Sequence, residues 1–187
     1  MVKELIIKNR SVRRYDNEKK LSAETLSELV DAARLCASAG NRQRIRYATV
    51  TEADNLKKMR AALGFAAYLK DWGGPSENEN PTGYVVMLTE DDDVNLFVDM
   101  GIAASSMLLL AAEMDIGGCI FRSFDPQNVK NIIGSEGYTP RLVISLGVPA
   151  ERVELTDAVG GDIRYYREND IHKVPKLSLE EVLIAEK

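Results

Sequence analysis

Three arginines near the N-terminus, Arg10, Arg13 and Arg14, flank Ser11 within the stretch NRSVRRYD (residues 9–16). An arginine side chain can place two parallel hydrogen bonds on phosphate oxygens, and a serine hydroxyl can add another. In an extended segment Ser11 and Arg13 point to the same side, and Arg10 can join them where the chain bends. These residue types fit a phosphate-binding loop, although a solvated basic loop gives the same pattern.

A second polar stretch, SAGNRQ (residues 38–43), carries amide side chains at Asn41 and Gln43. Each amide offers both a donor and an acceptor, so the pair can contact the polar edge of a flat heterocycle. By itself the stretch is also typical of a loop that ends a helix. Together with the arginine stretch, it predicts a ligand with a phosphate at one end and a polar ring at the other.

Signatures of other catalytic sites do not occur in the sequence. There is no GxGxxG after a predicted strand and no GxxxxGK[ST], and His172 is the only histidine, which excludes a clustered-histidine metal site. We interpret His172 as a surface or packing residue and the acidic run at 90–94 as a solvated turn. No side chain is assigned as catalytic, and a bound cofactor is expected to supply the reactivity.

The composition is that of a soluble globular protein. Hydrophobic residues make up 45% and charged residues 28% of the 187 positions, so we expect one domain that spans residues 1–187. The net charge of −5 argues against nucleic acid as a partner, because such a surface needs a basic footprint.

The sequence also bears on the compartment. Neither an export signal nor a membrane span is expected, because charged residues interrupt the start of the chain and the longest apolar run is short. Cys36 and Cys119 form no CxxC and are predicted to be reduced core residues. The expected location is the cytoplasm.

The elements that would position these residues follow from hydrophobic spacing. Helices are predicted at Lys3–Lys8, from Ser22 to about Ala37, at Asn55–Leu69, at Asn95–Met114 and near Pro126–Ile133, and strands at Ile45–Thr51, Tyr84–Thr89 and Arg141–Val148. After Pro149 the pattern loosens and predicts no regular element. Because helices and strands alternate irregularly, an α+β fold is favoured over a regular βαβ array.

The predicted helix at Asn95–Met114 is the most informative of these elements. Its centre, residues 100–112, is apolar or small on every side, which is typical of a helix buried all round. In a chain of this length, such a helix suggests that a partner subunit covers one side.

Six segments of the sequence form a recognisable series: RSVRRY (10–15), SAGNRQRIRY (38–47), NPTGY (80–84), DMGIAASSMLLLAAEMDIGG (99–118), SLGVPAE (145–151) and YYRENDIHKVPKLSLEEV (165–182). In their order and spacing they resemble the nitroreductase family of flavin enzymes, specifically its small single-domain members. The set is collinear over nearly the whole chain.

The resemblance implies an α+β fold with a central, mostly antiparallel sheet flanked by helices, and an obligate-type homodimer with FMN at the interface. Carried over position by position, it places the phosphate and ribityl end of FMN at Arg10, Ser11, Arg13 and Lys176, the ring at Ser38, Asn41 and Gln43, and the flavin N5 near the backbone of Gly117 and Gly118.

Four positions depart from the pattern of that family. Asn9 and Leu177 stand where arginines are usual, and Arg44 and Ile45 replace a Pro-Trp pair. Each charge-assisted hydrogen bond contributes roughly 1.5–3 kcal/mol, so the loss of two cations predicts weaker FMN binding unless Arg14 replaces one. The rim beside the ring is also predicted to be more basic and less aromatic.

The activity that the resemblance implies is FMN-dependent NAD(P)H oxidoreduction. Hydride would pass through flavin N5 to a nitroaromatic, quinone or similar acceptor, and the shared site predicts ping-pong kinetics. The departures leave a second interpretation, a module of the same fold that binds flavin or another phosphorylated ligand with little or no turnover. A nucleic-acid contact through the arginines is a third, against which the acidity of the chain argues.

Overall fold

The structure is a computed structural model that describes residues 1–91 and 93–187. Along the chain the helices and strands are α1 (Val2–Lys8), α2 (Ala23–Arg34), β1 (Arg46–Val50), α3 (Ala53–Ala62), β2 (Gly83–Thr89), α4 (Val94–Glu113), β3 (Gly117–Phe121), α5 (Pro126–Ile133), β4 (Thr139–Gly147), β5 (Arg152–Asp157), β6 (Tyr166–Glu168), β7 (Ile171–Lys176) and α6 (Leu179–Val182). Two short 3-10 turns lie at Ala39–Asn41 and Glu77–Glu79.

Four strands form the central sheet in the order β1-β2-β4-β3, and each neighbouring pair is antiparallel. The strand β2 is buried along its whole length, as its apolar sequence predicts. The strand β3 lies at one edge, where Ser11 adds a parallel bridge to Gly118. The predicted α+β class with an antiparallel sheet is therefore confirmed.

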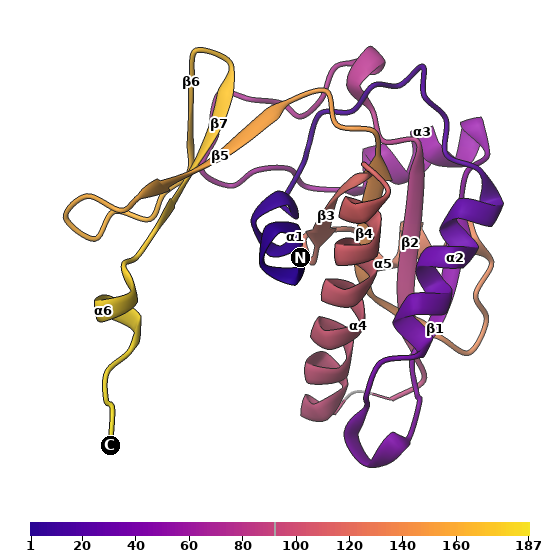
Figure 1. Cartoon of the computed structure of the whole chain (residues 1–187). Helices are drawn as coiled ribbons and strands as arrows, with labels where there is room; N and C mark the ends of the chain where they lie inside the picture. The colour runs from indigo at the N-terminus through magenta and orange to yellow at the C-terminus, as the bar shows by residue number, and fades with distance from the viewer. Residues whose placement is uncertain (92) are drawn as a thin grey trace.

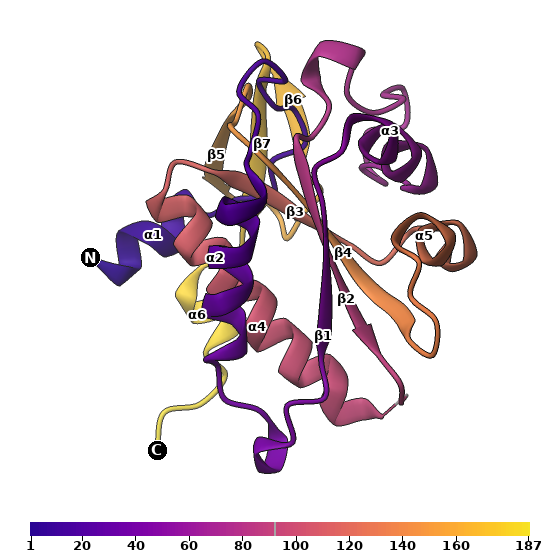
Figure 2. The same ribbon diagram turned by 90° about the vertical axis from the view of Figure 1, so that its right-hand side faces the viewer.

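Helices cover both faces of this sheet (Figure 2). On one face α2 and α4 enclose a core that contains Met87, Met100 and Met107. On the other face α3 and α5 enclose a second core around Tyr84 and Phe121. The central sheet thus separates two hydrophobic cores.

The segment after Pro149 folds into a second sheet, although the sequence predicted no regular element there. Its strand order is β5-β7-β6, with β5 parallel and β6 antiparallel to β7. This sheet and α6 project from the main body as a C-terminal arm, residues 152–187 (Figure 1). The end of the arm exposes apolar side chains, including Leu179, Val182 and Ile184.

Two helices end earlier than predicted. The helix α2 begins as expected after Ser22, whose side chain accepts a hydrogen bond from Thr25 N, but it ends at Arg34 rather than near Ala37. The helix α3 ends at Ala62 rather than at Leu69. The loop at residues 38–43 contains Gly40, whose φ is positive at 58°, but this glycine lies in a separate 3-10 turn and does not cap α2.

The helix α4 is buried on one side only. Met100 and Met107 lie in the core, whereas Val98 and Ile102 are 59% and 41% exposed. The prediction of burial all round was therefore wrong for the single chain. By length and composition α4 could also cross a membrane, but its packing against the sheet and α2 makes it a core helix of this fold.

Candidate functional site

The arginine loop is fastened to the edge of the central sheet. Ser11 forms a bridge with Gly118, and Val12 N donates to Gly118 O at 3.0 Å. Just beyond, the fully buried Tyr15 donates its hydroxyl to Val12 O at 2.6 Å and contacts Ser145 Oγ at 2.7 Å. These contacts fix the backbone from which the arginines project.

Arg10 and Ser11 open onto a cavity of about 210 Å³, which Asn9, Ser105, Leu108 and Gly118 also line. Arg10 Nη2 donates to Ile6 O at 2.6 Å, while its Nε is buried and has no partner among the described residues. Burial lowers the pKa of this guanidinium from its usual value. Arg10 and Ser11, two residue types that can donate to an anion, thus lie side by side in the wall of this cavity.

A buried carboxylate holds this loop against the C-terminal arm. Glu151, whose side chain is 1% exposed, accepts from the backbone N–H groups of Arg13 at 2.5 Å and Arg14 at 3.1 Å. Its other oxygen accepts from Arg167 Nη2 at 2.9 Å. Glu151 thus joins the arginine loop to β6.

The arm also contacts the side chain of Arg13 directly. Arg13 Nη1 donates to Ser11 O at 3.2 Å and lies 3.3 Å from His172 Nε2, and its guanidinium lies over the Tyr165 ring at 5.0 Å. Burial, followed by the charge of Arg13, lowers the pKa of His172, while Glu151 opposes the shift. The neutral imidazole can therefore accept from Arg13. The sequence left a surface or a packing role open for His172, and its exposure of 1% shows that it is a packing residue.

The side chain of Arg14 is paired with two carboxylates. Its Nε donates to Glu79 Oε1 at 2.5 Å and its Nη1 to Asp170 Oδ1 at 2.6 Å. The hydrogen bond to Glu79 is the main cause of the raised pKa of Arg14. Arg14 therefore does not replace the cation that is missing at Asn9.

Gly117 and Gly118 allow close packing within the chain. A Cβ at Gly117 would lie 2.7 Å from Val12 Cγ2, and one at Gly118 would lie 2.5 Å from Leu108 Cδ2. Both glycines are thus required by the docking of β3 against the arginine loop and α4. The space that they leave is filled by protein atoms.

Ser38, Asn41 and Gln43 lie at the other end of α4. Ala39 N donates to Asp99 Oδ1 at 2.9 Å, which ties this loop to the first turns of the helix. Within the loop, Gln43 N donates to Ser38 Oγ at 3.3 Å and Gln43 Nε2 donates to Asn41 Oδ1 at 3.3 Å. Figure 2 shows this loop at one end of α4, whereas α1 and β3 lie toward the other end of that helix.

Lys176 lies at the end of β7 on the arm and is exposed (Figure 1). It is not among the residues that line the cavity of Arg10 and Ser11. One chain therefore brings together Arg10, Ser11, Gly117 and Gly118, with Arg13 nearby. It does not bring Ser38, Asn41, Gln43 or Lys176 into the same cavity.

The acidic run near residue 92 pairs with an arginine. Arg44 Nη1 lies 3.0 Å from Asp93 Oδ2 and 3.7 Å from Asp91 Oδ2, while residue 92 itself lies outside the described part of the chain. Among the described residues there is no group of three or more His, Cys, Asp or Glu side chains that could hold a metal ion.

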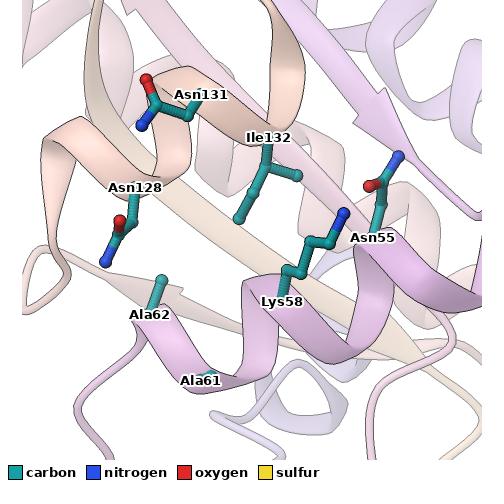
Figure 3. A pocket seen from close by; sticks show the side chains of 7 residues that line it. All are labelled: Asn55, Lys58, Ala61, Ala62, Asn128, Asn131 and Ile132. Carbon is teal, nitrogen blue, oxygen red and sulfur yellow. The ribbon is translucent and has the colours of Figure 1, made fainter.

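A surface groove of about 450 Å³ lies away from all of these residues, between α3 and α5. Figure 3 shows Asn55 and Lys58 on one helix facing Asn128, Asn131 and Ile132 on the other. The groove offers amide groups and one ammonium group, and none of the predicted site residues line it.

Sequence reasoning did not assign a role to Glu151 or Tyr15, although both are central to the loop. Glu151 lies in the SLGVPAE segment, and the available signal was a charged residue three positions after the predicted buried strand Arg141–Val148. The role of Tyr15 had no comparable signal, because its partner Ser145 is 130 positions away.

Comparison with known proteins supports the resemblance. The sequence model of the nitroreductase family matches residues 6–72 and 78–148. A protein from Archaeoglobus fulgidus, which carries the provisional name NADH dehydrogenase/NAD(P)H nitroreductase, is 26% identical over 82% of this chain and 88% of its own length.

Solved structures show the same fold. A protein from Bacteroides thetaiotaomicron with the same provisional name has a TM-score of 0.70 at 19% identity, over 99% of this chain and 96% of its own. One from Staphylococcus epidermidis, provisionally named NAD(P)H:FMN oxidoreductase, has a TM-score of 0.67 at 17% identity, over 85% and 91% of the two chains.

Proposed function

The chain belongs to the nitroreductase family, and on this basis we propose that it is an FMN-dependent NAD(P)H oxidoreductase that acts on a nitroaromatic, quinone or similar acceptor. Bound FMN would take up hydride from NAD(P)H and pass electrons to the acceptor. The observation that carries the proposal is the cavity at β3, which Arg10, Ser11 and Gly118 line together. There the buried Nε of Arg10 lacks a partner among the described residues.

The role of the chain in this proposal is to bind and orient the cofactor. Arg10 and Ser11 would donate to phosphate oxygens, and Arg13, held by His172 and Tyr165, would add its charge beside them. No side chain is assigned as a general acid or base. The electron donor and the acceptor would use the same face in turn, so ping-pong kinetics are expected.

Two copies of the chain would complete the site. Asp99 holds the Ser38 loop, whereas Ser105 and Leu108 line the Arg10 cavity, so the two sets are separated by roughly 9–14 Å along α4. A flavin that contacts both sets would take one from each protomer of a two-fold homodimer. The exposed face of α4 would form the interface, and Lys176 would reach the partner's site from the arm.

An absorbance spectrum of the purified protein tests the proposal, before and after addition of FMN. We expect flavin bands that bleach with NADH or NADPH and return with a nitroaromatic or quinone acceptor. A colourless protein that takes up no added FMN would contradict it.

A second candidate function is binding of FMN, or of another phosphorylated ligand, without turnover. The commitment of Arg14 to Glu79 and Asp170 favours it, because no nearby arginine then compensates for Asn9. Bound flavin that stays oxidised in excess NADH and NADPH would support this candidate, and rapid bleaching would exclude it.

A further inference from the structure

The C-terminal arm meets the arginine loop at the ring of His172, on the central strand β7 of the second sheet. His172 is 1% exposed, and its Nε2 lies 3.3 Å from Nη1 of Arg13. Because a guanidinium can only donate, Nε2 is the unprotonated, accepting nitrogen. The proton of the neutral ring then lies on Nδ1, which is buried and has no hydrogen-bond partner among the described residues.

Positive charge faces this ring from two elements. Arg13 faces it from the arginine loop, and Arg167, which is the residue opposite His172 on β6, faces it from the arm. Glu151, between β4 and β5, is the carboxylate that opposes these charges. Its oxygens already accept from the backbone of Arg13 and Arg14 and from the side chain of Arg167, so it is not free to follow a proton on the imidazole.

The other groups packed against the imidazole are neutral or already paired. The ring of Tyr165, in the segment before β6, has its centroid 5.2 Å from that of the imidazole. On β5 the residue opposite the histidine is Val153, and the neighbouring Glu154 pairs with Arg152 and Lys173. Among the described residues, these neighbours therefore provide no carboxylate that could neutralise a charged imidazole.

Protonation of His172 is incompatible with its present contact. A proton on Nε2 would turn the acceptor into a donor that faces the Arg13 guanidinium, which cannot accept, and would bring two like charges together. Burial, followed by the charge of Arg13, already lowers the pKa of the ring; Glu151 opposes this shift and Arg167 adds to it. A proton can therefore be taken up only when Arg13 and His172 separate.

A second contact of the arm provides a reporter of its position. Trp72 is the only tryptophan in the chain. The guanidinium of Arg167 lies over its indole at 4.2 Å, and the ring of Phe65 meets it edge-on at 6.2 Å. Because Arg167 on β6 lies opposite His172 on β7, a movement of the arm around His172 changes the surroundings of the indole.

We propose that the contact between His172 and Arg13 is an acid-sensitive latch between the C-terminal arm and the arginine loop. The latch is closed while the imidazole is neutral. When the imidazole is protonated, the two side chains separate, and β6 and β7 move away from the arginine loop and from Trp72. This inference goes beyond the proposed redox function, because the latch requires neither flavin nor turnover.

The test uses the full-length purified protein without FMN and follows the emission of Trp72 from about pH 7.5 to about pH 5. We expect the emission maximum to move to longer wavelength with the profile of one titrating group, while circular dichroism shows that the central sheet stays folded. In His172→Gln the amide oxygen can still accept from Arg13 but the side chain does not titrate, so the emission should stay constant. Asp71, next to the indole, is present in both proteins and cannot cause a difference between them.

Two further variants test the charge that opposes protonation. Arg13→Gln removes the positive charge at Nε2, so the midpoint of the emission change should rise by about 0.5 pH unit or more. Arg164→Gln is the matched control, because Arg164 also lies in the arm but is exposed and pairs with Asp162; its midpoint should equal that of wild type. Both variants keep His172, so they test the proposal even if His172→Gln does not fold.

The proposal is overturned by constant emission in folded wild-type protein, by the same emission change in folded His172→Gln, or by an unchanged midpoint in Arg13→Gln. No sample contains flavin, so a protein that binds no FMN can still show the latch. Failure of the latch is therefore distinguishable from failure of the proposed function, which the absorbance spectrum tests separately.

Discussion

Glu151 is the residue on which both the arginine loop and the C-terminal arm depend. Its carboxylate accepts from the backbone of Arg13 and Arg14 and pairs with Arg167. In Glu151→Gln the remaining oxygen can still accept from the backbone of Arg13 and Arg14, but the NH₂ group that then faces Arg167 can neither accept its hydrogen bond nor pair with its charge. We expect the free energy of unfolding in urea to fall by about 2 kcal/mol, the scale of a charge-assisted hydrogen bond.

Glu168→Gln is the matched control for this change, because Glu168 is exposed on the neighbouring strand β6. It should shift the free energy of unfolding by no more than about 0.5 kcal/mol. Similar losses in the two variants would contradict the role given to Glu151.

His172 makes stability depend on pH in a defined direction. Its folded-state pKa lies below the ordinary value of 6.5 because burial and Arg13 disfavour the charged ring; Glu151 opposes this and Arg167 adds to it. The unfolded chain therefore binds a proton that the folded chain does not. The stabilising contribution is fully present above about pH 6.5 and is lost as the pH falls through the folded-state pKa.

Urea denaturation from about pH 7.5 to about pH 5.5 checks this prediction. Wild type should lose more stability over that range than His172→Gln, in which the titrating ring is absent while the other ionisable groups remain. Equal losses would show that the His172 ring does not contribute.

At the scale of elements, the edge strand β3 is placed by glycine. A Cβ at Gly118 would lie 2.5 Å from Leu108 Cδ2 and 2.9 Å from Ser145 O. Gly118→Ala should therefore push β3 away from α4 and β4 and lower the free energy of unfolding by about 1–3 kcal/mol. Thermal unfolding measures the effect, with Gly134→Asn as a control, since a Cβ there meets nothing within 4 Å and asparagine tolerates its positive φ.

Elements with strong local signals were predictable from the sequence. The helix α5 has the predicted bounds because Asp125 caps it, Pro126 begins it and Gly134 ends it with φ 64°. The strand β2 was evident from its continuous apolar run. The strands of the arm were not predicted, because β5 and β6 consist of exposed and half-buried positions only and lack a continuous apolar face.

The candidate site was predictable only where its parts are local. The Arg10–Arg13 segment is contiguous, and its residue types indicate an anion site. The bond from Arg13 N to Glu151 spans 138 positions, so only the fold could reveal it. The position of the Ser38 loop at the far end of α4, away from the Arg10 cavity, likewise follows from the topology and could not be predicted from the sequence.

The exposed face of α4 is where a dimer would form if two chains share one flavin. Gly101 lies on this face between Val98 and Ile102, and a Cβ there meets nothing within 4 Å in the single chain. For an isolated chain, Gly101→Arg should be harmless and should even favour the helix by about 1 kcal/mol. In a dimer packed through this face, the same change would bury an unpaired charge.

Gly101→Arg should therefore give a folded monomer by circular dichroism and light scattering, with FMN affinity at least tenfold below that of wild type. Ala61→Arg is the control, because Ala61 is exposed on α3, which packs on the other face of the central sheet. That variant should stay dimeric and keep its flavin.

A dimeric Gly101→Arg protein would exclude the α4 interface, and a monomer with full FMN affinity would show that one chain forms the whole site. Loss of the dimer together with the flavin would indicate that the Arg10 cavity and the Ser38 loop meet only between two chains.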